Sequence, residues 1–65
     1  MKYTATIILE YSDDSNVTFD VTMEGKEHDI VAMLLMITRG TLMVSMACKA
    51  TCYKPDGFEI CSYVK

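Results

Sequence analysis

An almost unbroken apolar stretch in the second half of the chain is the feature that most limits the possible folds. From Ile30 to Cys52 nearly every residue is apolar, small or threonine, and the main interruptions are Arg39, Gly40 and Lys49. Its longest wholly apolar run, IVAMLLMI, is much shorter than the roughly 20 residues that a membrane helix needs. We therefore expect this stretch to form the core of one compact domain, residues 1–65.

The hydrophobic period changes within this stretch. Before Gly40 the apolar residues recur with the period of an α-helix, and after it they alternate as in a β-strand. A glycine is also the residue that most often caps a helix C-terminus in the left-handed conformation. The pattern predicts a helix over about 26–39 and a long strand over about 42–53. The alternative is one helix through residue 48, which places Gly40 and Thr41 inside the helix at a modest cost.

The first quarter of the chain predicts a β-hairpin. Residues 2–11 and 17–24 alternate between apolar and polar side chains and are rich in β-branched residues. The segment SDDSN between them is typical of a turn, because these side chains hydrogen-bond to nearby backbone. A register with Leu9 opposite Phe19 places both apolar sets on one face of the sheet.

A second hairpin is predicted around the segment KPDG. Proline presets the backbone for a turn, and Gly57 can occupy its left-handed position. Pairing Lys54 with Phe58 then sets Cys52 opposite Ile60, which agrees with the alternation of the preceding strand.

These elements predict an α+β fold in the order β-β-α-β-β, with one helix packed on a four-stranded, mainly antiparallel sheet. The strand order 2-1-3-4 is favoured because the third strand is the most apolar, which suits a central position. The order 1-2-3-4 is the alternative and requires a right-handed crossover between parallel strands.

The charge is unevenly distributed along the chain. The formal net charge is −3, but residues 1–29 hold seven acids against two lysines, a net charge of −5. This balance argues against a general nucleic-acid-binding protein, which presents a basic face. It suggests an acidic patch that attracts a basic partner. The candidate members of this patch are Glu10, Asp13, Asp14 and Asp20.

The three cysteines do not form a predictable disulfide or metal site. Cys48 and Cys52 are expected on one strand face, about 13 Å apart, too far for a disulfide. Cys61 is expected on the opposite face, across from Thr51. We interpret Cys48 and Cys52 as small core residues and Cys61 as a partly exposed thiol without a specific role.

No arrangement of residues predicts catalysis or a bound cofactor. His28 is the only histidine, and its neighbours Glu27 and Asp29 are expected to point to other sides of the helix. The sequence has no glycine-rich phosphate loop and no calcium-loop pattern. We therefore expect a protein that is not an enzyme, with no catalytic residues, metal, cofactor or evident small-molecule substrate.

The predicted helix carries more apolar surface than one small sheet can cover, an arc of about 200° where about 100° is usual. Exposed apolar surface of this kind often marks a protein interface. We therefore expect a small cytoplasmic protein-interaction module, a homodimer or a binder of another protein, that contacts neither membrane nor nucleic acid. The alternative is an acidic inhibitor or decoy that binds a basic site on a nucleic-acid-processing protein. The candidate interface residues are Val31, Leu35, Met36, Ile8, Met43, Tyr53 and Tyr63.

Overall fold

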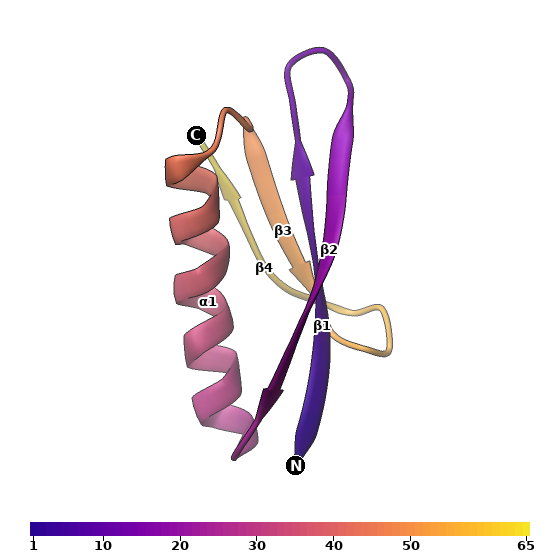
Figure 1. The fold of residues 1–65 in the computed structure, drawn as a ribbon, viewed down its shortest axis with the longest axis vertical. Coiled ribbons are helices and arrows are strands. Elements are labelled where there is room, and N and C mark those ends of the chain that lie inside the picture. Colours follow the sequence, from indigo (N-terminus) through magenta and orange to yellow (C-terminus); the bar gives the residue numbers. More distant parts are fainter.

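The computed structural model describes all residues, 1–65, as a single layer of sheet with one helix (Figure 1). All strand pairs are antiparallel, and the strand order is β2-β1-β3-β4. The predicted fold class and the favoured strand order are therefore confirmed. The elements in chain order are β1 (Lys2–Glu10), β2 (Asn16–Glu24), α1 (Glu27–Val44), β3 (Lys49–Tyr53) and β4 (Glu59–Val64).

The predicted boundary at Gly40 is wrong, because α1 continues through it to Val44. Gly40 does not have the positive φ of a left-handed cap, and one glycine costs a helix only about 1 kcal/mol. Burial of Leu42 on the same side as Leu34 outweighs that cost. The helix ends at Ser45, whose backbone N–H donates to the carbonyl of Thr41. The strand β3 is accordingly short and does not extend over 42–53.

For the first hairpin, the prediction of which side chains share a face is confirmed, but the predicted register is wrong by two residues. Leu9 lies opposite Val17, and the predicted partner Phe19 lies opposite Ile7. The loop is tighter than expected because Tyr11 N–H donates to the Ser15 carbonyl at 2.9 Å. A shift of two residues leaves every side chain on its predicted face.

The second hairpin closes as predicted but contains a bulge that the sequence did not indicate. Lys54 N–H donates to the Phe58 carbonyl at 2.7 Å, and Gly57 adopts the expected left-handed φ of 93°. A register shift follows at Cys52/Tyr53, so that Cys52 lies opposite Cys61 rather than Ile60. One extra residue moves the following side chains to the other face.

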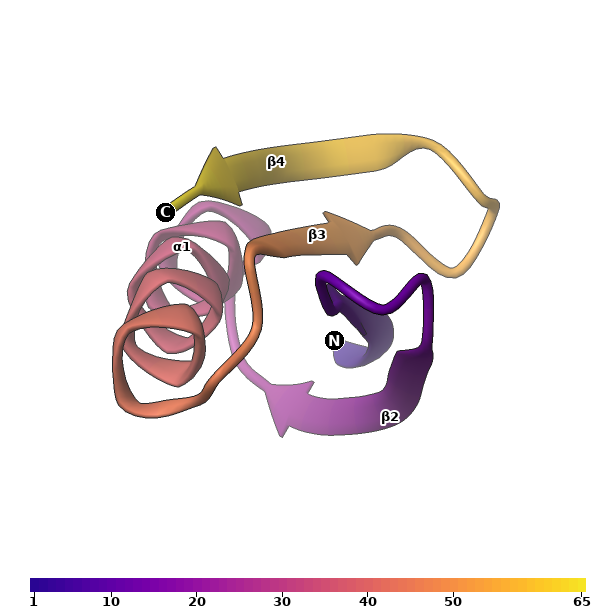
Figure 2. The ribbon, with the colours of Figure 1, turned by 90° about the horizontal axis from the view of Figure 1, so that it is seen from above.

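The core lies between the inner face of the sheet and α1, which packs mainly on β3 and β4. Its helical members are Ile30, Leu34 and Leu42, and the buried Thr38 donates its hydroxyl to the Leu34 carbonyl at 2.7 Å. Seen from above, the four strands follow a strongly curved path with α1 along one side (Figure 2). The side chains that form the main core cluster are Tyr3, Ala5, Ile7, Leu9, Ile30, Leu34, Leu42, Ala47, Ala50 and Cys52.

Candidate interaction surfaces

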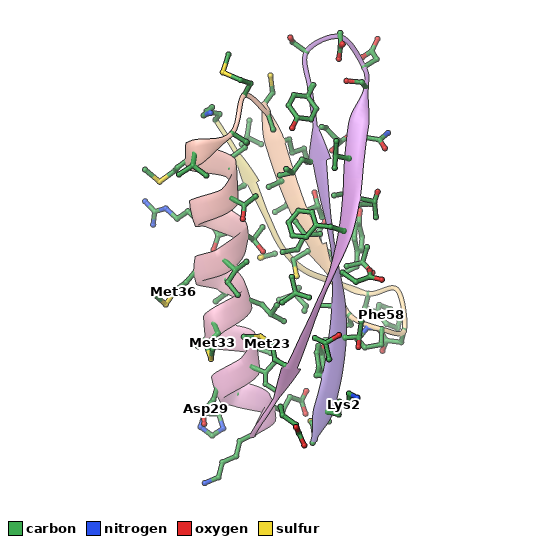
Figure 3. All side chains as sticks on the ribbon, viewed as in Figure 1. Lys2, Met23, Asp29, Met33, Met36 and Phe58 are labelled. Carbon is green, nitrogen blue, oxygen red and sulfur yellow. The ribbon has the colours of Figure 1, made fainter.

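The outward face of α1 carries a stripe of exposed methionines. Met36 is 74% exposed and Met43 is 68% exposed, and both face away from the buried helical residues. Met33 borders them and is 49% exposed. Figure 3 shows Met36 pointing from the helix away from the sheet. We call Met33, Met36, Gly40 and Met43 the methionine stripe, since at 100° per residue the four share one face.

Gly40 lies between Met36 and Met43 in this stripe. A Cβ atom added there would meet no atom within 4 Å, so no close contact within the monomer requires glycine. The backbone does not require it either, because its φ is not positive. Gly40 therefore weakens the helix without an evident reason inside a single copy of the chain.

The other predicted interface residues do not join one surface. Val31 and Leu35 are half-buried on one flank of α1. Ile8 and Tyr53 are half-buried on the sheet face opposite the helix, as predicted. Met36 is the only predicted interface residue that lies in the methionine stripe and was also expected on the helix.

Two of the predicted interface positions are corrected by the structure. Met43 was expected on the outer sheet face and instead lies on the outward face of α1, because the helix continues past Gly40. Tyr63 was also expected on the outer sheet face. It lies opposite Ala50 and packs against the core, because the β-bulge changes its face.

The predicted acidic residues are all exposed. Glu10 ends β1, while Asp13 and Asp14 form the tip of the hairpin. Hydrogen bonds from Ser15 lower the pKa of the Asp13 carboxyl. Asp20 lies apart from them on β2, where it accepts a hydrogen bond from the Thr6 hydroxyl at 3.0 Å. None of the four forms a salt bridge with a lysine or arginine.

The cysteines differ from the prediction in two ways. Cys48 is exposed rather than in the core, and Cys61 faces the buried Cys52 across β3 and β4 rather than Thr51. Burial raises the pKa of both the Cys52 and Cys61 thiols. Raised pKa values keep the thiols protonated and so favour a packing role over a nucleophilic one.

His28 contacts its chain neighbour rather than standing alone. Its Nε2 atom lies 3.0 Å from a carboxylate oxygen of Asp29, and both side chains are largely exposed. The expectation that the two point to different sides of the helix is wrong, although the exposed position itself is confirmed. No third group converges on the pair, and no cluster of three or more potential metal ligands occurs in the structure.

A shallow hollow of about 310 Å³ lies at the end of the molecule that holds the N-terminus. The buried Tyr3 hydroxyl at its wall has no hydrogen-bond partner. Burial raises the Tyr3 pKa, and the nearby carboxylates of Glu27 and Asp56 raise it further. Sequence reasoning missed this hydroxyl, because the alternation of β1 identifies Tyr3 only as a core residue. The hollow is lined by Met1, Lys2, Tyr3, Glu27, Lys54, Pro55 and Asp56.

Comparison of the chain with protein-family models, curated proteins and solved structures finds no match in any of the three. The helix lacks the combination of length and hydropathy that a membrane-spanning helix needs.

Proposed function

We propose that this chain is a small protein-interaction module that self-associates through the methionine stripe of α1. The observation that carries the proposal is a row of exposed methionines that includes a glycine, Gly40, with empty space beside it. Flexible, polarisable methionine side chains suit adaptable apolar contacts. A glycine lets a second helix, or a side chain from it, approach the backbone closely.

The spacing of the stripe suits an antiparallel pair of helices. Met36 and Gly40 lie symmetrically about position 38, and so do Met33 and Met43. A twofold axis at that level sets Met36 of one copy over Gly40 of the other, and Met33 beside Met43. Both contacts occur twice, as an isologous interface requires.

The small core gives a physical reason for association. A domain of this size buries only about 60% of the surface that its unfolded chain exposes, and oligomerisation is one common compensation. Only 12 of the 65 residues are buried in the monomer. Covering the methionine stripe removes further apolar surface from water.

Sedimentation equilibrium of the native chain and of Met36→Glu tests the proposal. We expect the native mass to rise from 7.3 kDa toward that of a dimer as concentration increases. Met36→Glu should remain a monomer, because its carboxylate would be buried against a second helix. Phe58→Glu is the matched control, since Phe58 is 71% exposed but lies in the β3–β4 loop. A native monomer at millimolar concentration would reject the proposal.

The exposed acidic residues favour a second candidate function, an acidic inhibitor or decoy for a basic site on a nucleic-acid-processing protein. Glu10, Asp13 and Asp14 are exposed at one end of the molecule and form no salt bridge, although Glu10 lies opposite Lys49 on β3. A pull-down at low and high ionic strength tests it. Such a complex should dissociate in about 1 M salt, where screening acts within about 3 Å. A partner that stays bound at that salt concentration rules out this candidate.

A further inference from the structure

The outer edge of β2 is a long strand edge without a pairing partner. The Met1 N-terminus and the Gly25 N–H each donate to the other residue's carbonyl, both at 3.0 Å. Hydrogen-bonded pairs alternate along an antiparallel ladder, so the odd-numbered residues of β2 bond to β1. The backbone groups of Thr18, Asp20 and Thr22 therefore point away from β1, toward the free edge.

This edge lacks most of the features that usually prevent strand addition. Proteins protect such edges with proline, charged side chains (especially lysine), bulges or short strands, and of these β2 has only the carboxylates of Asp20 and Glu24. The nine residues of β2 include no proline and no lysine and pair with β1 in an unbroken register. The opposite edge strand, β4, is shorter, has six residues and follows a bulge.

The inner face beside this edge is incompletely covered. Phe19, Val21 and Met23 point to the helix side of the sheet but remain half-buried, and Val17 is 50% exposed. The helix packs mainly on β3 and β4. Figure 3 shows Met23 between β2 and α1. An added strand would cover these side chains with its own apolar residues.

The outer face of β2 carries negative charge only. Asp20 and Glu24 are its charged side chains, and both are exposed. In a strand added beside β2, the residues next to Thr18, Asp20 and Thr22 share this outer face. Basic side chains at those alternate positions would be favoured, whereas a second acidic β2 would be repelled.

We infer that the free edge of β2 binds an extended segment of another protein in which basic residues alternate with apolar ones. The segment adds a fifth strand to the sheet. Its backbone pairs with the outward groups of β2, its basic side chains lie beside Asp20 and Glu24, and its apolar side chains cover Phe19 and Val21. This mode of recognition draws affinity from main-chain hydrogen bonds and specificity from alternate side chains. The surface is separate from the methionine stripe.

Titration of the isotope-labelled chain with a heptapeptide of alternating lysine and valine tests this inference by NMR. The comparison peptides have the same composition with the lysines in one block, or glutamate in place of lysine. We expect saturable shifts of the backbone amides in β2 with the alternating basic peptide, and weaker or no shifts with the other two. No binding, equal binding of the blocked peptide, or shifts confined to α1 or to the 12–15 loop would overturn the inference.

Two variants separate the contributions of backbone and charge. Thr22→Pro removes one outward N–H and leaves the backbone hydrogen bonds to β1 in place. It also removes the Thr22 hydroxyl that lies 3.1 Å from the Thr4 hydroxyl, but so does Thr22→Ala, relative to which binding should weaken roughly tenfold. Asp20→Asn keeps an acceptor for Thr6 but removes the charge, and should weaken binding about two- to fivefold at low salt. If Thr22→Pro does not fold, Asp20→Asn still decides, since unchanged affinity would contradict the proposed charge contact. Met36→Glu should bind the peptide normally, so failure of self-association and failure of strand addition are distinguishable.

Discussion

Gly40 is the residue whose presence the single chain explains least. It lies in the last third of an 18-residue helix, on the exposed face, with open space around it. Glycine at such a position lowers helix stability by about 1 kcal/mol relative to alanine. Close packing of a second helix against this position would explain why it is occupied by glycine.

Gly40→Ala should therefore have opposite effects on folding and on association. We expect the free energy of unfolding of the monomer to rise by about 0.5–1 kcal/mol, because the unfolded chain loses freedom and no clash arises. The added methyl group would obstruct Met36 of the second copy, so the dimer dissociation constant should increase. Urea unfolding at low concentration and sedimentation at high concentration measure the two effects. Association that is unchanged by Gly40→Ala would contradict the placement of Gly40 in the interface.

The cysteines should react with an alkylating reagent at distinct rates. Cys48 is exposed and should react first, Cys61 is half-buried and should react more slowly, and the buried Cys52 should react last. Burial raises the pKa of Cys52 and Cys61, so a smaller fraction of each is the reactive thiolate at neutral pH. Mass spectrometry after timed labelling gives the order, and labelling in urea is the control in which the differences disappear. Fast labelling of Cys61 would instead indicate an activated thiol.

Residue-scale prediction failed mainly where one backbone irregularity changed the face of many side chains. The bulge at Cys52/Tyr53 moves Cys61 and Tyr63 to the helix side. No turn residue marks this bulge in the sequence. The hairpin loop itself was predictable, because proline and Gly57 fix its conformation.

At the scale of the element, the buried side of α1 stabilises the fold and its exposed side does not. Leu34 is fully buried, and Leu34→Ala should lower the free energy of unfolding by about 2–5 kcal/mol. Met36→Ala on the opposite side should change it by less than about 0.5 kcal/mol under conditions where the chain is monomeric. Thermal or urea unfolding at low concentration measures both. A large effect of Met36→Ala on the monomer would show that the stripe belongs to the core.

The end of α1 could not be read from periodicity because the segment after Gly40 fits two periods. Leu42, Val44 and Met46 alternate as in a strand, yet Leu34, Thr38 and Leu42 also lie on one helical face. The helical solution buries Thr38 and Leu42 together against the sheet. Local propensity did not distinguish a helix from a strand in this segment. The contacts that favour the helix come from β3 and β4, which follow it in the chain.

At the scale of the whole molecule, strand order was predictable and function was not. Two hairpins joined by one helix leave few antiparallel arrangements, and the apolar third strand belongs inside. The candidate interface was only partly predictable. Met36 lies on the exposed stripe, whereas Val31 and Leu35 are half-buried on α1 and Tyr63 packs against the core. The large number of apolar residues in the sequence indicates that some apolar surface stays exposed. The location of that surface depends on where α1 ends.

Association should also make stability depend on protein concentration. If the folded state is a dimer, each tenfold increase in concentration should raise the melting temperature by roughly 3–6 °C for a domain of this size. Circular dichroism melts over a hundredfold range of concentration measure the shift. Met36→Glu should melt at one temperature throughout. A concentration-independent native melt would argue against a dimer that is coupled to folding.

The most direct test of the central claim is an isotope-filtered NOE experiment on a mixture of labelled and unlabelled chains. This experiment detects only contacts between copies. The antiparallel helix pair predicts intermolecular NOEs from the Met36 methyl group to the Gly40 α-protons, and from Met33 to Met43. Intermolecular NOEs that involve only β2 or the sheet, or none at millimolar concentration, would contradict self-association through the methionine stripe.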